Sequence, residues 1–410
     1  MHMETRNSKT EMPLFKVKGE KFIFAVQMKL QGKCRVVGEN RMEKIKLTDI
    51  CNPKQWKTIP TSELLEDGYP VYGANGIIGY YSEFNHKNPV ITVTCRGATC
   101  GTINITVPKS YVTGNAMCLD DVRSDIYMEY LYYCLKHYNF NNVISGSAQP
   151  QITRQGMEKI YVTIGSHNEQ MDIVDKLKKV ENVIGLKKQE LKQLDTFVKS
   201  RFVELFGDPI KNPKGWEVVK LSECLERIDN GKSFTCDSNA REGVFPAILK
   251  LSAATYGDYR PYENKALLDE KQFVESVEVH RGDLLFTRKN TPDLVGMAAY
   301  VFETPEKLMM PDLIFRLVTN ERMTPTFLWQ LINNREFRPA IQGISGGSAK
   351  SMSNISKERL KNIEVICPPI SEQKKLEGVL EQVDKSKSKI QKSLEETQLL
   401  FDSLMQKYFG

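Results

Sequence analysis

Two short segments of the sequence place an arginine directly after a run of apolar and β-branched residues. Thr94-Cys95-Arg96 is followed by Gly97, and Phe286-Thr287-Arg288 is followed by Lys289 and Asn290. An arginine on a loop can donate two hydrogen bonds to O6 and N7 of guanine, and an asparagine can pair similarly with adenine. The segments therefore supply a set of candidate DNA-binding residues, namely Arg96, Arg288, Lys289 and Asn290, with Thr94 and Thr287 beside them.

For either arginine taken singly, a surface salt bridge or a contact with phosphate alone is the stronger alternative. The occurrence of the arginine at matched places in two halves of the chain favours base reading. Asn75 is a further candidate, because a turn flanked by glycine can bring backbone amides close to phosphates, although Asn-Gly is also a common hairpin turn with no ligand. The matched loops 145–148 and 346–350 could contact DNA or only connect elements.

The sequence lacks the motifs expected of a catalyst. It contains no Gly-x-Gly cofactor turn, no Gly-x-x-x-x-Gly-Lys phosphate loop and no Asp/Asn-Pro-Pro-aromatic motif of aminomethyltransferases. Cys367-Pro368-Pro369-Ile370 shares only the two prolines with that last motif. The nine cysteines form no Cys-x-x-Cys pair and the five histidines are scattered, so a metal site or disulfide framework is not expected. We predict a non-catalytic chain that binds no cofactor or metal of its own.

The elements that must position these residues are organised around a stretch that the chain contains twice. Glu169 to Gly207 recurs 203 residues later as Glu372 to Gly410, without a gap. Apolar residues spaced by four and three predict the seam of a coiled coil, formed by Ile173, Leu177, Val180, Ile184, Leu191 and Leu194 in the first copy and by Leu376, Leu380, Val383, Ile390 and Leu394 in the second. Two helices of one length and phase are most simply interpreted as partners. Further apolar residues, such as Leu186, Phe197, Val203 and Leu399, exceed what one seam needs.

Each predicted helix follows a globular segment in which short strands dominate. Lys46 to Asp49 matches Lys220 to Glu223 at an offset of 174, and Ile152-Thr153-Arg154 matches Ile355-Ser356-Lys357 at an offset of 203. The offset only grows, so insertions accumulate in the loops of the second copy. We predict an α+β fold with an internal pseudo-twofold repeat, in which two domains of mixed α/β type are separated by two long antiparallel coiled-coil helices. The predicted division is 1–41 (an extension of unknown role), 42–165 (first domain), 166–207 (first helix), 208–215 (linker), 216–368 (second domain) and 369–410 (second helix).

The net charge gives weak support for DNA binding. The chain of 410 residues carries a formal charge of +6, and residues 1–41 alone, with nine Lys/Arg and four Asp/Glu, supply +5. Any basic face must therefore come from arrangement rather than from excess charge.

The absence of an apolar run of about 18 residues and of a signal-peptide core predicts no membrane association. The cysteine usage predicts a cytoplasmic protein.

Several runs make the chain resemble the specificity subunit of a type I restriction-modification enzyme, over roughly Met42 to Gly410. These runs are Gly68 to Tyr81 (GYPVYGANGIIGYY), Gly282 to Arg288 (GDLLFTR) and Ile370-Ser371-Glu372-Gln373 at the start of a helix. The resemblance implies two target recognition domains spaced by two helices. It also implies that the helices dock two modification subunits that methylate adenine, and that restriction subunits then translocate and cleave DNA. S-adenosylmethionine, ATP and Mg would be used by those partners, and not by this chain.

The leading hypothesis is therefore a subunit that recognises a bipartite, asymmetric site in double-stranded DNA. The whole complex would be a site-specific deoxyribonuclease and adenine DNA methyltransferase. One alternative is a coiled-coil scaffold that binds proteins and has no DNA specificity. A weaker alternative is an enzyme with an unrecognised site, which methylation or cleavage by the isolated chain would support.

Overall fold

The computed structural model describes residues 42–74, 76–146, 149–346 and 352–410. The predicted extension 1–41 and the candidate Asn75 lie outside the described residues. The chain forms two compact units: the first comprises the residues up to Leu186 together with Leu394–Gly410, and the second comprises Lys187–Ser393. Each unit therefore contains one globular domain and a part of each long helix. None of the described helices is both long enough and apolar enough to cross a membrane.

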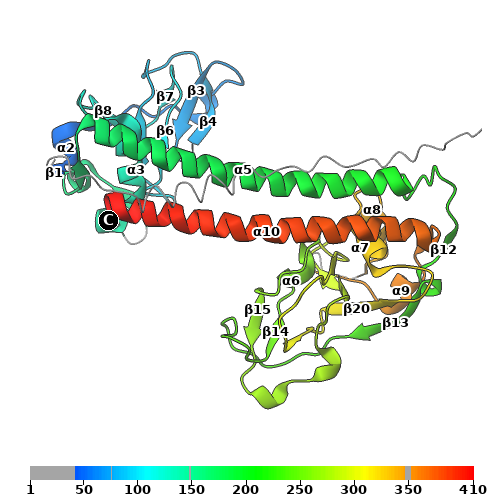
Figure 1. Ribbon diagram of the computed structural model, residues 1–410. Helices are drawn as coiled ribbons and strands as arrows, with labels where there is room; N and C mark the ends of the chain where they lie inside the picture. The colour runs from blue at the N-terminus through cyan, green and yellow to red at the C-terminus, as the bar shows by residue number, and fades with distance from the viewer. Residues whose placement is uncertain (1–41, 75, 147–148, 347–351) are drawn as a thin grey trace, which may run out of the picture. The chain divides into compact units, whose positions relative to one another are not determined.

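Two helices of 40 residues each follow the globular domains, α5 (His167–Phe206) and α10 (Ile370–Phe409) (Figure 1). At 1.5 Å per residue, each is about 60 Å long. Neither contains an internal proline. At the start of α5 the carboxylate of Glu169 accepts a hydrogen bond from the backbone N–H of Ser166 at 2.8 Å, which satisfies one of the free donors there. The helix ends at Gly207, whose φ of +78° suits glycine at a helix C-terminus.

The domain of the first unit is built on two sheets, confirming the predicted α+β class. A four-stranded antiparallel sheet has the order β2-β8-β5-β6, and a three-stranded sheet has the order β4-β3-β7 with β3 and β7 parallel. A third pairing, β1 with β11, leads into α5. The bounds are β1 Glu43–Lys46, α2 Leu47–Ile50, β2 Asn52–Gln55, β3 Tyr69–Gly73, β4 Gly76–Tyr81, β5 Ile91–Thr94, β6 Ile103–Ile105, β7 Tyr111–Val112, β8 Ala116–Asp120, α3 Met128–His137, β9 Ile144–Ser145, β10 Gln151–Ile152, α4 Arg154–Met157 and β11 Tyr161–Ile164.

The domain of the second unit repeats this topology. Its four-stranded sheet has the order β13-β20-β16-β18, its three-stranded sheet has the order β15-β14-β19 with β14 and β19 parallel, and β12 pairs with β22 before α10. The bounds are β12 Val218–Lys220, β13 Leu225–Asn230, β14 Ala247–Leu249, α6 Ser252–Thr255, β15 Asn264–Ala266, β16 Leu284–Thr287, β17 Lys289–Asn290, β18 Ala298–Tyr300, β19 Leu308–Met309, β20 Ile314–Thr319, α7 Pro325–Asn333, α8 Arg338–Gly343, β21 Ser353–Asn354, α9 Lys357–Lys361 and β22 Glu364–Ile366.

One buried glutamine joins the first domain to the start of α5. The side-chain oxygen of Gln170 accepts a hydrogen bond from the backbone N–H of Tyr127 at 2.7 Å. Its side-chain nitrogen donates to the carbonyls of Asp125 and Gly165, both at 3.0 Å. Tyr127 immediately precedes α3, so the glutamine satisfies a free donor at the start of that helix.

Gln373 makes the same three bonds in the second unit. Its oxygen accepts from the N–H of Thr324 at 2.8 Å, directly before α7, and its nitrogen donates to the carbonyls of Arg322 at 2.9 Å and Pro368 at 2.7 Å. Gln170 is 1 % exposed and Gln373 is fully buried, so neither set of bonds competes with water. We call these two side chains the glutamine anchors, because each fixes its domain to its long helix.

The predicted seam residues lie on the packed side of each helix. In the first unit, Ile173, Leu177, Val180 and Ile184 of α5 belong to one buried cluster with Phe401, Leu404 and Met405 of α10. In the second unit, Leu376, Leu380 and Val383 of α10 share a cluster with Val198, Phe202 and Phe206 of α5. Leu191, Leu194, Ile390 and Leu394 are half-buried. The seam therefore merges with the core of each domain, because α3 and α7 contribute to the same two clusters.

Polar side chains interrupt this packing within the second unit. Lys187 is only 8 % exposed and donates a hydrogen bond from Nζ to Oγ of Ser393 at 2.5 Å. Lys387 forms an ion pair with Asp195. A buried polar pair across two helices costs stability but penalises any register that leaves the lysine unpaired. These two pairs therefore specify how α5 and α10 align.

Two glycines inside the long helices give a stability prediction. Gly185 and Gly378 are exposed, and a Cβ added at either would meet nothing within 4 Å. Gly185→Ala and Gly378→Ala should each raise the free energy of unfolding by about 0.5–1 kcal/mol, because alanine restricts the unfolded chain more than glycine does. Urea denaturation measures the change. As a contrast, Gly231→Ala should destabilise strongly, since its Cβ would lie 2.0 Å from the carbonyl oxygen of Pro311. A loss of stability in either helical variant would contradict the prediction.

Candidate nucleic-acid interface

Arg96 lies on an exposed loop at the end of β5. The loop is fastened to the segment around β10 by backbone hydrogen bonds from Ile152 N–H to the carbonyl of Cys95 at 3.0 Å and from Gly97 N–H to the carbonyl of Pro150 at 3.2 Å. Gly97 has φ +86°, which favours glycine, so the chain turns directly after the arginine. The backbone is thus held by two strands while the Arg96 side chain stands in solvent.

Thr94 supports this loop from inside the domain. It is 1 % exposed, and its hydroxyl donates a hydrogen bond to the carbonyl of Ala74, directly after β3. Its backbone pairs with Thr102 and Gly101, both at 2.8 Å. In this structure Thr94 therefore connects the arginine loop to the end of β3 and does not face solvent.

Arg288 differs from Arg96 in its surroundings, and the predicted match between them is off by one residue: the backbone pairing aligns Arg288 with Cys95 and Lys289 with Arg96. Its guanidinium lies over the ring of Phe315, 5.0 Å from the centroid, and Nη2 donates to the side-chain oxygen of Asn354 at 3.4 Å. Its Nε is buried and has no acceptor among the described residues. Arg288 is half-buried. Its guanidinium is therefore held in one place, whereas that of Arg96 is free to move.

The neighbours of Arg288 are held by backbone pairing. Lys289 and Asn290 form β17, which pairs with β21. Asn290 is 8 % exposed, donates from Nδ2 to the hydroxyl of Thr255 at 3.2 Å and accepts from Thr291 N–H at 2.9 Å. Thr287 is fully buried, and its hydroxyl donates to the carbonyl of Met297 at 3.1 Å. Of this group, Arg288 and Lys289 are the more accessible side chains.

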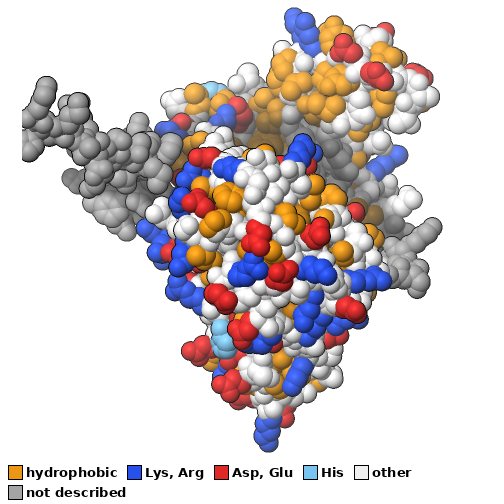
Figure 2. All heavy atoms as spheres, turned by 90° about the vertical axis from the view of Figure 1, so that its right-hand side faces the viewer, with side chains coloured by type: hydrophobic (Ala, Val, Ile, Leu, Met, Phe, Trp, Pro, Cys, Tyr) orange, Lys and Arg blue, Asp and Glu red, His pale blue; other side chains and the backbone are white. Residues whose placement is uncertain are grey.

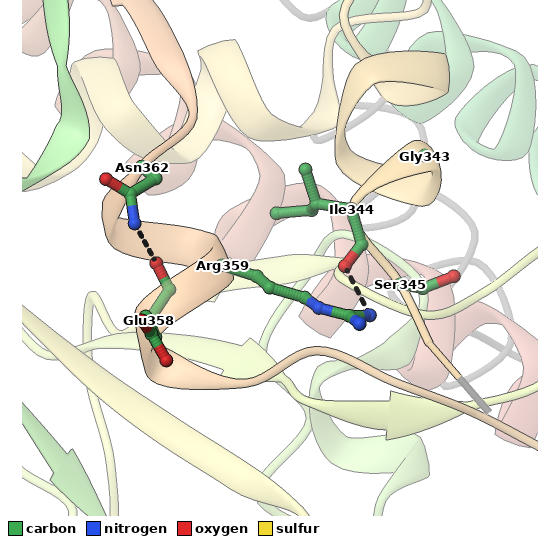
Figure 3. Close-up of a pocket in the computed structure, with 6 residues that line it drawn as sticks. All are labelled: Gly343, Ile344, Ser345, Glu358, Arg359 and Asn362. Atoms are coloured by element: carbon green, nitrogen blue, oxygen red, sulfur yellow. Dashed lines mark hydrogen bonds between the residues drawn. The ribbon is translucent and has the colours of Figure 1, made fainter.

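Sequence reasoning missed Lys357, a cation beside Arg288, and Arg359, two residues further along the chain. Lys357 also lies over Phe315, with Nζ 5.5 Å from the ring centroid. The exposed Arg359 donates from Nη1 to the carbonyl of Ile344 at 3.5 Å and lines an open cavity of about 660 Å³. Figure 3 shows Arg359 coming from the same side of the cavity as Glu358 and Asn362, with its guanidinium reaching toward Ile344 and Ser345. The sequence repeat could have identified Lys357, because it matches Lys357 with another cation, Arg154. Arg154 is exposed in the first unit.

The first unit also carries an exposed apolar surface on β4 and its flanks. Leu65, Ile77, Ile78, Tyr80 and Phe84 are between 37 % and 52 % exposed. Figure 2 shows hydrophobic side chains gathered at the top of the view, the part that holds β3, β4 and β7 in Figure 1. β4 pairs with β3, and Ala74, directly after β3, accepts a hydrogen bond from Thr94 at the end of the strand that leads into the Arg96 loop.

One group of described side chains has the residue types of a metal site. Atoms of His86, Cys118 and Asp120 lie within 4.8 Å of one another. However, the two ring nitrogens of His86 face Asn85 Oδ1 at 2.6 Å and Asp120 Oδ1 at 3.0 Å. Trp56 Nε1 donates to the other oxygen of Asp120 at 3.1 Å. Hydrogen bonds thus already engage both ring nitrogens of His86 and both carboxylate oxygens of Asp120.

These features define a class of protein with two copies of one α+β domain, each fixed to a 40-residue helix and each bearing cations on a loop at the end of a central strand. The profile of a protein family matches residues 39–196 and again 213–397. The chain belongs to this family, described as the type I restriction modification DNA specificity domain.

Several proteins of known name are similar to this chain. The type I restriction enzyme EcoEI specificity subunit of Escherichia coli is 31% identical over 204 residues, which cover 48% of this chain and 34% of that protein. A putative MjaX specificity subunit of Methanocaldococcus jannaschii is 26% identical, with 46% of its length covered. The chain thus matches between a third and a half of the length of these two curated relatives. The MjaVIII specificity subunit of the same organism is 22% identical over 355 residues, with 80% of this chain and 81% of that protein covered.

Solved structures have the same fold. The crystal structure of a type I restriction-modification system S subunit from M. genitalium superposes with a TM-score of 0.61 at 14% identity, covering 92% of this chain and 98% of that chain. A second structure, from a study of complex assembly in the type I R-M system, gives a TM-score of 0.50 at 17% identity, with 90% and 97% covered. At these identities the likeness concerns the fold.

Proposed function

We propose that this chain is the DNA specificity subunit of a type I restriction-modification complex and recognises a bipartite, asymmetric target in double-stranded DNA. The observation that carries the proposal is the presence of two copies of the specificity domain in one chain. Each copy is attached to a long helix by the same buried glutamine anchor. Two recognition domains that differ in their loops, each attached to its long helix in the same way, suit a target with two different halves.

The two long helices are proposed to be an antiparallel coiled coil that sets the spacing between the half-sites. In the first unit, the beginning of α5 shares a cluster with the end of α10. In the second unit, the end of α5 shares a cluster with the beginning of α10. Antiparallel pairing accounts for both, and under this proposal an approximate twofold axis would relate the two domains. Because duplex DNA has an axis of the same kind relating its strands, the two domains can approach opposite halves of the target in equivalent ways.

Base reading is assigned chiefly to Arg96 in the first domain and to Arg288 with Lys289 in the second. Arg96 has an exposed side chain on a fixed backbone, so it can donate two hydrogen bonds to guanine without displacing an internal partner. Lys357 adds positive charge beside Arg288, and the exposed Arg359 follows two residues later, which suits phosphate contacts that position the domain. Asn75 completes the proposed set in the first domain, whereas Thr94, Thr287 and Asn290 hold the loops in place.

The chain is proposed to act without catalytic chemistry of its own and to dock modification and restriction subunits, which would use S-adenosylmethionine, ATP and Mg. The long helices keep exposed apolar residues that their own domains leave uncovered, namely Leu186, Phe197, Val203 and Leu399, each at least 46 % exposed. Apolar side chains left exposed on a helix that is otherwise packed are typical of partner interfaces. This surface supports the docking of helices from partner subunits.

Co-expression with a modification subunit tests the proposed function. Single-molecule sequencing of the host DNA should then find methylated adenine in one split motif with an undefined spacer. Expression of each protein alone is the control and should leave the DNA unmodified. A stable complex that methylates no defined motif would favour the coiled-coil scaffold instead. Methylation by the isolated chain would contradict the non-catalytic assignment.

A further inference from the structure

Two buried cysteines meet where the second domain joins α10. Cys224 follows the short 3-10 helix Leu221–Glu223, and Cys367 follows β22. The thiol of Cys224 donates a hydrogen bond to the sulfur of Cys367 at 3.8 Å. Both segments are anchored nearby, since Cys367 N–H donates to the carbonyl of Glu217 at 2.8 Å and Asn320 N–H donates to the carbonyl of Cys224 at 3.0 Å. A disulfide needs a sulfur separation of about 2.05 Å, so the sulfurs must approach by less than about 2 Å.

The internal repeat indicates that packing alone does not require these thiols. The offsets that align the two copies, 174 at the first strand and 203 at the last, match Cys224 with Ile50 and Cys367 with Ile164. Ile50 is 1 % exposed and Ile164 is 6 % exposed, and both lie in the core of the first unit. Isoleucine thus fills both positions in one copy of the fold. The other copy has two thiols in hydrogen-bond contact at the same positions.

Cys367 has the surroundings of a reactive thiol. Its pKa is lowered to about 7, first by the hydrogen bond from Cys224 and also by the charge of Arg322, against burial and the charge of Glu217. Burial instead raises the pKa of Cys134. Cys367 is 8 % exposed and lines an open cavity of about 470 Å³, together with Trp216 and Arg322. A small oxidant can therefore reach the sulfur that ionises more readily.

We propose that Cys224 and Cys367 are a redox modification site that peroxide converts to a disulfide. The Cys367 thiolate attacks one oxygen of hydrogen peroxide, breaks the O–O bond and becomes a sulfenic acid, and the released hydroxide takes up a proton to give water. The sulfur of Cys224 then attacks the Cys367 sulfur, its proton joins the departing hydroxyl, and a second water leaves. The two thiols lose two electrons and the peroxide gains them.

The bond would lock the junction that Gln373 holds by hydrogen bonds. The carbonyl of Arg322 accepts from Gln373 and lies 3.6 Å from the Cys367 sulfur, so the anchor and the thiol pair share one residue. The cysteines are 143 residues apart in sequence, which makes the closed loop long. Long loops gain most from cross-linking in the chain-entropy description, and a rise in Tm of roughly 5 °C is expected.

The test treats the reduced full-length protein with hydrogen peroxide, blocks the remaining thiols with N-ethylmaleimide and maps the cysteines by mass spectrometry. The expected product is a peptide pair joined through Cys224 and Cys367 that has lost two hydrogen atoms. It should form about tenfold faster than Cys134 is oxidised. The rate should rise as pH passes through about 7, because the thiolate is the attacking form. Persistence of both thiols under these conditions would overturn the proposal, as would cross-links spread over other cysteines.

A variant that carries the isoleucine of the first domain distinguishes the chemistry of the thiol pair from its contribution to packing. In Cys224→Ile, the cross-link and the rise in Tm should vanish. A dimedone adduct should appear on Cys367, but more slowly than the cross-link forms in the unaltered chain, because the hydrogen bond that lowers the pKa of Cys367 is lost. Cys100→Ser, a change at a partly exposed thiol outside the pair, should leave both effects intact. If the isoleucine variant folds poorly, the presence or absence of the cross-link in the unaltered chain is sufficient to test the proposal. If the unaltered chain forms no cross-link but still directs methylation, the redox proposal fails and the proposed DNA specificity stands.

Discussion

Gln373→Leu is expected to lower the free energy of unfolding of the second unit by about 3 kcal/mol or more. The substitution leaves two buried backbone groups without a partner, the N–H of Thr324 and the carbonyl of Pro368, and it leaves the carbonyl of Arg322 with only the distant thiol of Cys367. Each unsatisfied buried group costs about 1–3 kcal/mol, and leucine supplies no replacement donor or acceptor. Urea denaturation followed by circular dichroism measures the loss.

Two further variants make this result specific to the anchor. Gln382→Leu changes the same residue type at an exposed position of α10 and should alter stability by less than about 0.5 kcal/mol. Gln373→Glu should be as harmful as leucine at neutral pH, because a carboxylate would face two carbonyls. Burial raises the pKa of such a carboxyl above its unfolded value, so stability is lost as pH rises through the folded pKa and should be regained in acid. Equal effects of Gln373→Leu and Gln382→Leu would show that the three bonds contribute little.

Arg96→Ala is expected to weaken binding of the assembled complex to its target by roughly 10- to 100-fold, since a good bidentate contact discriminates by about 1–3 kcal/mol. The loss should be confined to one half of the bipartite motif. Because the Arg96 side chain is exposed, the stability of the chain should not change. Arg288→Ala should affect the other half and also lower stability, since that side chain covers Phe315 and bonds to Asn354. Fluorescence anisotropy with duplexes altered in one half at a time measures the binding.

Arg123→Ala provides a matched control in the first unit. Arg123 is exposed and paired with Asp125 at 2.7 Å, so its removal subtracts the same charge without touching the Arg96 loop. If Arg96→Ala and Arg123→Ala weaken binding equally and for every sequence, Arg96 contacts only the phosphate backbone. Methylome sequencing of the Arg96 variant offers an independent measure, because a relaxed half-site appears there as a degenerate base.

Local patterns in the sequence were sufficient to predict the elements. The β-branched and aromatic runs at Tyr69 to Tyr72 and at Val90 to Thr94 correspond to β3 and β5, and the run rich in Tyr and Leu at Tyr127 to His137 corresponds to α3. Alternating apolar residues and turn residues determine these elements within a few positions. In the sequence, the glutamine anchors appear only as residues that recur at equivalent places of the repeat, without any indication of their hydrogen bonds. The partners of Gln170 and Gln373 are backbone groups up to 45 and 51 residues away, so only the folded chain brings them together.

The difference between the two candidate arginines also depends on tertiary structure. The sequence repeat matches Arg96 with Arg288, but the backbone pairing matches Arg96 with Lys289 and Cys95 with Arg288: Ile355 N–H donates to the carbonyl of Arg288 as Ile152 N–H donates to that of Cys95. The first domain therefore has a buried cysteine at the place where the second holds a guanidinium over Phe315. The proximity of Cys224 to Cys367 was likewise out of reach of cysteine spacing, since 143 residues separate them. Sequence spacing does not reveal which side chains a sheet brings together.

The division of the chain into units has a consequence for synthesis on the ribosome. The second unit is one continuous segment, Lys187–Ser393, whereas the first also needs Leu394–Gly410. The domain that is translated first is therefore completed last. Until Phe401, Leu404 and Met405 leave the ribosome, the apolar side of early α5 around Leu177 has no α10 residues to cover it. A nascent chain passes through this stage at every round of translation, so the first unit is the part of the molecule most dependent on protection by chaperones.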